Sequence, residues 1–190
     1  MTGTTHRLAG ITAGIVVTEV LHIHDLKMQT VIIGGCVLGS LLPDIDNPQS
    51  TISYKIPFVR IIFGIFQKMI RILSGLLPNK QGNYIRSCIG HRGLTHSLFA
   101  VIFLPAISCL ITRMIGYADN LFSISLGIGI LSHIILDIFS GGTRLLLPFS
   151  AVNIKLMKIR TGGVIEILIC FCFSCFLVNW AAEWILNSKL

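Results

Sequence analysis

The sequence contains four groups of histidine and aspartate, which are residue types that bind metal ions. All four groups lie at the ends of apolar segments that share one predicted membrane face. They are His6, Asp44 with Asp46, His91 with His96, and His133 with Asp137. A bilayer tolerates ionisable side chains only where they pair, coordinate an ion or face a protein-lined cavity. Chance would scatter such groups over both membrane faces. Their common position makes a metal centre the leading hypothesis.

Asp44 and Asp46 occupy a short acidic turn between Pro43 and Pro48. Proline disfavours helix for the residue before it, so this turn is predicted to be extended. Alternate residues of an extended segment point the same way, which would bring both carboxylates to one point. The alternative is a polar turn that caps a membrane helix.

The most specific motif, His-Arg-Gly-Leu-Thr-His-Ser, begins at His91. Gly93 permits a tight bend, and Thr95 is suited to cap the helix that is predicted to follow. His91 and His96 can then face one site. Arg92 is suited to bidentate binding of a phosphate group. The alternative is a basic linker beside the membrane.

His133 and Asp137 lie four residues apart within an apolar segment, a spacing that places both on one helix face. Helices that supply two metal ligands use this spacing. The alternatives are a simple hydrogen bond, or an Asp137 that orients His133 on its metal. Glu166 begins the last apolar segment on the same side and is a candidate general base or ligand. The alternative for Glu166 is an acid favoured by the helix dipole.

The composition is that of a membrane protein, since 53% of the 190 residues are hydrophobic and 12% are charged. Soluble domains average about 25% charged residues. The apolar segments predict an all-α, polytopic transmembrane bundle of about five spans, in a single domain of residues 1–190. They cover residues 8–24, 30–42, 97–115, 121–139 and 164–186.

Residues 43–96 form a polar connection that includes a helix of a different kind. Arg60, Gln67, Lys68 and Arg71 share one face of residues 56–77, and apolar side chains cover the rest. This pattern predicts a basic amphipathic helix at the membrane interface, with a further span as the alternative. Residues 78–83 are predicted to form an exposed loop.

The net charge of +7 is unevenly distributed, because twelve of the 15 Lys and Arg residues fall on the side of the candidate ligands. Positive loops face the cytoplasm, so the site is predicted to face it too. Membrane topology explains this charge, and nucleic acid is not an expected partner.

The order of these motifs resembles the YdjM family of membrane-bound proteins, for which a metal-dependent hydrolase activity is inferred. The matching pieces are Thr5-His6, Leu42 to Asp46, His91 to Ser97, His133 to Asp137 with Gly141-Gly142-Thr143, and Arg160 to Glu166. The resemblance covers nearly the whole chain and implies a helical protein of the bacterial inner membrane with a hydrolytic metal site. A fainter similarity is to helical zinc-dependent phospholipases C and related nucleases.

These observations predict a membrane-embedded, metal-dependent hydrolase that acts at the cytoplasmic face. The predicted metal ligands are His6, Asp44, Asp46, His91, His96, His133 and Asp137. This set is larger than the four ligands that one tetrahedral ion binds. One or two divalent ions, zinc or manganese, would activate water and hold a phosphoryl or acyl oxygen.

Two further residues have predicted catalytic roles: Arg92 would neutralise developing charge, and Glu166 would move protons. The preferred substrate is a lipid phosphoester, because the basic helix favours anionic headgroups. The competing predictions are an ion or proton-coupled transporter and a membrane-anchored binding module for a cytoplasmic partner.

Overall fold

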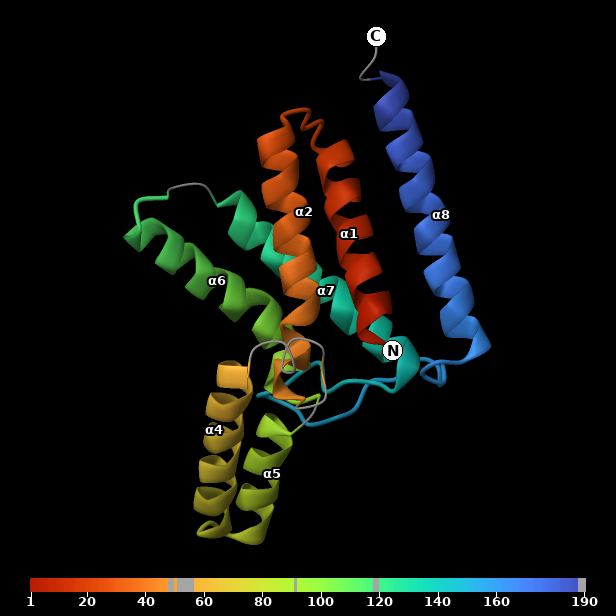
Figure 1. Ribbon diagram of the computed structural model, residues 1–190. Helices are drawn as coiled ribbons and strands as arrows, with labels where there is room; N and C mark the ends of the chain where they lie inside the picture. Colours follow the sequence, from red (N-terminus) through yellow and green to blue (C-terminus); the bar gives the residue numbers. More distant parts are fainter. Residues whose placement is uncertain (48–49, 51–56, 91, 118–119, 188–190) are drawn as a thin grey trace.

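The computed structural model describes residues 1–47, 50, 57–90, 92–117 and 120–187 (Figure 1). Seven α-helices and two short 3-10 helices make up this part of the chain, which contains no β-strand. They are α1 (Gly3–Val20), α2 (Leu26–Leu41), η1 (Pro43–Asp46), α4 (Pro57–Gly75), α5 (Asn79–Ile89), η2 (Leu94–His96), α6 (Leu98–Met114), α7 (Leu121–Ser140) and α8 (Val164–Asn187). The predicted all-α class is confirmed.

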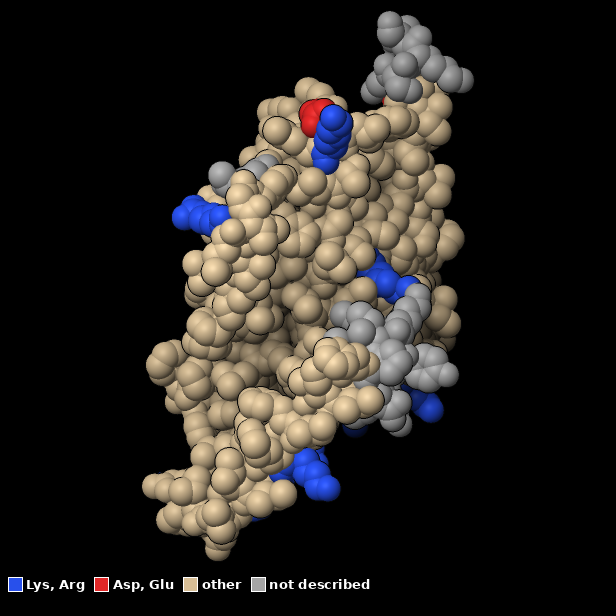
Figure 2. Space-filling view, turned by 60° about the vertical axis from the view of Figure 1, so that its left-hand side comes forward, with Lys and Arg blue, Asp and Glu red and all other residues tan. Residues whose placement is uncertain are grey.

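Three helical segments are long and apolar enough to cross a bilayer, namely Leu26–Asp46, Leu121–Ser140 and Val164–Leu186. α6 is a shorter apolar helix, and α1 has 18 residues. A span requires about 20 residues, so a polytopic membrane protein is confirmed and the number of five spans stays a prediction. Neutral side chains dominate the face seen in Figure 2, as lipid contact requires.

α7 is the central helix, and α1, α2 and α6 pack against it (Figure 1). Leu126, Ile130 and Ile134 recur every four residues along α7 and form a buried apolar stripe. His133 and Asp137 are buried on the same helix. The helix that holds the core together therefore also carries the proposed ligand pair.

Glycine permits α2 to approach α7 closely. A Cβ atom at Gly39 would lie 2.1 Å from the carbonyl oxygen of Leu126, and one at Gly129 would lie 2.1 Å from that of Cys36. Gly35 and Gly39 are four residues apart, a spacing that lets helices approach closely. This contact fixes where the end of α2 and the turn η1 meet α7.

α4 and α5 form an antiparallel pair that extends beyond the bundle at one end (Figure 1). α4 is a strongly amphipathic helix, as predicted, and its position relative to a bilayer stays a prediction. Gln67 is buried, and its amide donates to the carbonyl oxygens of Asp46 at 3.2 Å and Ile89 at 3.3 Å. The pair is thus attached to the turn that carries the acidic residues.

Two local predictions are wrong. Residues 79–83 belong to α5 rather than to an exposed loop, because polar residues can form the solvent face of a helix as well as a turn. Asp44 and Asp46 lie in a 3-10 turn rather than an extended segment. Pro43 starts this turn, a position where the missing N–H of proline has no helical partner to lose.

The contact between α2 and α7 can be tested by adding one methyl group. Gly39→Ala should destabilise the protein by about 1–3 kcal/mol, because the added Cβ meets rigid backbone. Gly34→Ala is the matched control, since its Cβ meets nothing within 4 Å and alanine favours helix. Thermal unfolding in detergent measures both. Equal midpoints for the two variants would contradict the proposed packing.

Candidate metal centre

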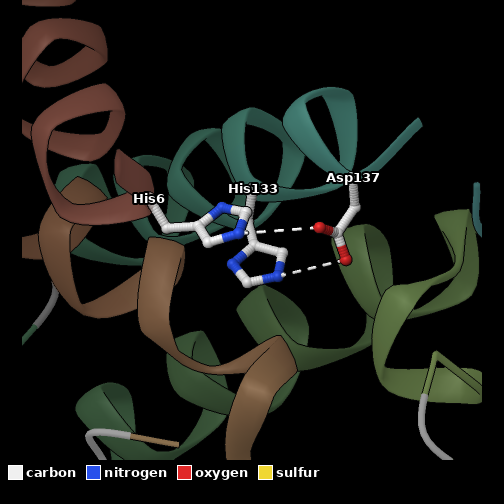
Figure 3. Close-up of side chains that lie close together, drawn as sticks. All are labelled: His6, His133 and Asp137. Atoms are coloured by element: carbon white, nitrogen blue, oxygen red, sulfur yellow. Dashed lines mark ion pairs between the residues drawn. The ribbon is translucent and has the colours of Figure 1, made fainter. Parts of the chain in front are cut away.

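The structure brings five of the predicted ligands together from four separate segments. His6 comes from α1, Asp44 from η1, His96 from η2, and His133 and Asp137 from α7. The groups His6, His133, Asp137 and Asp44, His96, His133 each have ligand atoms within 4.8 Å of one another. Figure 3 shows the first group, with the His6 and His133 rings beside the carboxylate of Asp137. His91 lies outside the described residues.

His133 is oriented by the backbone of α2. Its Nδ1 lies 2.6 Å from the carbonyl oxygen of Ser40, one of the last carbonyls of α2 that has no partner within its own helix. A carbonyl only accepts, so Nδ1 carries the proton and Nε2 presents a lone pair. This Nε2 lies 3.8 Å from Asp137 Oδ2, too long for a simple hydrogen bond.

His96 is oriented by a hydroxyl and a carboxylate. The hydroxyl of Thr95 donates to Asp46 Oδ2 at 2.7 Å and accepts from Nδ1 of His96 at 3.0 Å. Nε2 of His96 therefore points the other way, toward Asp44 Oδ1 at 3.8 Å and Asp137 Oδ2 at 3.4 Å. The expectation that Thr95 caps the next helix is wrong, because Ser97 takes that position.

The two acidic residues of η1 lie on opposite edges of the His96 ring. Asp44 is near Nε2, whereas Asp46 Oδ2 lies 3.6 Å from Nδ1. The prediction that both carboxylates face one point is therefore wrong, because a 3-10 turn rotates alternate residues apart. Asp46 lies beside Nδ1, the ring nitrogen that faces away from the candidate metal site, where it could orient a metal-binding histidine.

His6 completes the cluster from the first helix. Its ring stacks on that of His133, with centroids 3.7 Å apart and an interplanar angle of 14°. Its Nε2 lies 3.6 Å from Asp137 Oδ1. Its Nδ1 is buried without a hydrogen-bond partner among the described atoms. Such a histidine is held by packing and keeps one nitrogen directed at the carboxylate.

The spacing of these donor atoms fits a bound divalent ion. Nε2 of His96 and Nε2 of His133 are 3.3 Å apart, and each lies 3.8 Å from Asp44 Oδ1. Donor atoms at the corners of a tetrahedral zinc site, with bonds of about 2.0–2.1 Å, are about 3.4 Å apart. The four groups His96, His133, Asp44 and Asp137 could therefore surround one ion after small adjustments.

A second ion would have fewer ligands. Nε2 of His133 has a single lone pair, so His133 can bind only one ion even though it belongs to both groups. Asp137 differs, because Oδ1 faces His6 and Oδ2 faces His96 and His133. A carboxylate in this arrangement can bridge two ions, with His6 on the second.

Arg92 contacts a candidate ligand directly. Its Nη2 donates to Asp137 Oδ1 at 3.1 Å, its Nε lies 3.1 Å from Oδ2, and its Nη1 donates to the Gly142 carbonyl at 3.2 Å. Gly141 makes room for this guanidinium, since a Cβ there would lie 1.9 Å from Nη1. Arg92 was expected to bind phosphate, and in this structure its fork instead holds the carboxylate of Asp137.

Glu166 is buried at the start of α8 and is a neighbour of the cluster rather than a member. Its Oε1 accepts from the Thr2 amide at 2.5 Å and from the Thr5 hydroxyl at 2.5 Å, and Oε2 accepts from the Gly162 amide at 2.7 Å. Thr5 precedes His6. Glu166 therefore positions the first turn of α1, and its predicted role in proton transfer stays a prediction.

Sequence reasoning missed two contributions to the site. Ser40 acts through its backbone carbonyl, which leaves no signature in the side-chain pattern. Ser140 accepts from Arg92 at 3.3 Å and donates to Asp137 Oδ1 at 3.2 Å. Its position three residues after Asp137 on a helix could have indicated this contact.

The carboxylates around His96 are stabilised by a positive charge among them. Burial lowers the pKa of His96, but hydrogen bonds to Asp44 and Asp46, with the charges of Asp46 and Asp137, raise it to about 9. These three carboxylates therefore keep His96 protonated when no ion is bound. A divalent ion at the same place would displace that proton.

Comparison with known proteins places this chain in a family. The family model described as YdjM inner membrane protein matches residues 1–188. The chain is also 30% identical over 171 residues to the uncharacterized protein YvsG of Bacillus subtilis (strain 168), a match that covers 89% of this chain and 87% of that protein. No solved structure matches.

Metal analysis of the purified protein tests the centre. The wild type should retain at least one divalent ion per chain, and His133→Ala should lose the ion shared with His96, because it removes one of the two imidazoles that would hold it. His22→Asn is the control, since His22 has a positive φ of 50° that asparagine tolerates and lies at the other end of α1. Elemental analysis with a folding check by circular dichroism measures the outcome. Equal metal content in His133→Ala would contradict the assignment.

Metal affinity should decrease as the pH decreases. Below pH 9 the ion must displace the proton of His96, so the affinity should fall by about tenfold for each unit of decreasing pH. Calorimetric titrations in buffers of different ionisation heat count the protons released. Asp46→Asn removes a negative charge beside Nδ1 of His96, which lowers the pKa of this ring and should move the dependence to lower pH. An affinity independent of pH between 6 and 8 would be inconsistent with His96 as a ligand.

Proposed function

The chain belongs to the YdjM family of inner membrane proteins, and from that membership together with its buried His and Asp cluster we propose that it is a membrane-embedded, metal-dependent hydrolase. The observation that carries the proposal is the convergence of five donor groups, His6, Asp44, His96, His133 and Asp137, in two overlapping clusters that share His133. Packing alone does not require several ionisable side chains at one point near the end of a membrane helix.

A divalent ion with mixed nitrogen and oxygen ligands suits hydrolysis. Imidazole and carboxylate groups are compatible with zinc and with manganese. A bound ion would lower the pKa of a coordinated water and polarise the substrate oxygen. The residues of the chain would hold the ion, with Asp46 orienting His96 and Arg92 orienting Asp137.

The exposure of the candidate ligands indicates the direction of access. The side chain of Asp44 is 19% exposed, whereas those of His96, His133 and Asp137 are at most 3% exposed. A substrate would therefore reach the ion from the side of η1. This is also where the α4 and α5 pair is attached through Gln67.

We propose a lipid phosphoester as the substrate class, hydrolysed at the cytoplasmic face. The cluster lies near the ends of apolar helices, so a lipid headgroup is within reach without leaving the bilayer surface. Basic residues follow the central helix at positions 144, 155, 158 and 160, and they would attract an anionic headgroup. A phosphoryl oxygen is a hard ligand that the ion can polarise.

Hydrolysis assays with graded variants test the function. Purified protein with added zinc or manganese should release phosphate or headgroup from short-chain phosphatidic acid or phosphatidylglycerol. His96→Ala should lose activity by more than about a hundredfold, and Asp46→Asn by about ten- to a hundredfold, because it only orients the ligand. His22→Asn should retain full activity. Hydrolysis that persists in His96→Ala or without metal would exclude the proposed mechanism, and metal binding without hydrolysis would favour transport.

A further inference from the structure

A second cavity lies at the opposite end of the bundle from the metal centre. It has a volume of about 590 Å³ and is bounded by the end of α1, the following turn, the start of α2 and the last part of α8. Its lining includes Glu19, Gln29, Trp180, Glu183 and Trp184. The proposed hydrolase site uses none of these residues.

The cavity is acidic and aromatic. Two carboxylates and the imidazole of His24 line it, and none of its described lining residues is Lys or Arg. The indole N–H of Trp180 donates to Glu19 at 2.7 Å, and the amide of Asn179 donates to Glu183 at 2.9 Å, so both carboxylates are held in place. Carboxylates beside tryptophan faces attract an ammonium group by charge and by cation–π interaction.

An apolar groove adjoins this cavity. It has a volume of about 520 Å³, lies between α2 and α8, and is lined by Leu26, Ile33, Gly34 and Ile185 among others. Gln29, Trp180 and Trp184 line both spaces, so the acidic cavity and the apolar groove are neighbours. A polar cavity beside an apolar groove suits a headgroup with its attached chain.

We propose that this end of the protein binds a membrane lipid whose headgroup carries an ammonium, such as an ethanolamine phospholipid. The ammonium would lie between Glu19 and Glu183 against the tryptophans, and one acyl chain would lie in the groove between α2 and α8. The charge of the cavity selects this occupant over an anionic lipid. The groove selects a lipid over a free amine.

The two tryptophans make the site directly measurable, because they are the only ones in the chain and both line the cavity. The full chain is reconstituted in vesicles of equal phosphatidylethanolamine and phosphatidylglycerol content. Bromine, which quenches tryptophan, is placed on the acyl chains of one lipid or of the other. Quenching should be stronger with brominated phosphatidylethanolamine and should correspond to about a fivefold preference at the site.

Charge-neutral variants separate this site from ordinary interfacial tryptophans. Glu19→Gln combined with Glu183→Gln should reduce the preference to about one. Asp25→Asn is the matched control, because it removes a carboxylate at the same end, lies outside the cavity lining and retains the helix cap. Its preference should equal that of the wild type. Equal quenching by both lipids in the wild type, or an unchanged preference in the double variant, would overturn the proposal. Metal content should be unaffected throughout, so this test is independent of the hydrolase.

Discussion

The balance of charge among buried ionisable groups is the constraint on which the site depends. Asp137 is nearly inaccessible to water, yet it lies beside three imidazoles and one guanidinium. A buried carboxylate is costly unless it is paired and hydrogen-bonded. Arg92 neutralises one negative charge, and the remaining groups require a proton or a metal ion among them.

Helix packing determines whether this balance can be achieved. The backbone of α2 touches that of α7 only because glycines occupy the contact, and the same contact brings the Ser40 carbonyl to His133. A separation larger by one methyl group would break the hydrogen bond that fixes the tautomer of the ring. The packing of α2 against α7 therefore positions the candidate ligands of α7 as well as its apolar stripe.

Side-chain patterns allowed much of this arrangement to be predicted. The shared helix face of His133 and Asp137 follows from helix periodicity and the membrane class follows from composition, and both predictions are confirmed. The prediction failed where the backbone decides the outcome. Pro43 starts a 3-10 turn, and this turn separates Asp46 from Asp44 across the His96 ring. Polarity alone could not distinguish the first turns of α5 from a loop.

Because the candidate ligands come from separate segments of the chain, a bound ion would also stabilise the folded state. Asp44, His96 and His133 lie far apart in sequence, so one ion would connect three segments that an unfolded chain holds separately. Binding to the folded state alone stabilises that state in proportion to the logarithm of the ion concentration over its dissociation constant. The same ion would replace the proton on His96 and remove the need for a charged imidazole in a buried place. Metal loading and the correct assembly of η1, η2 and α7 are therefore thermodynamically linked, because the ion binds only when all three segments meet.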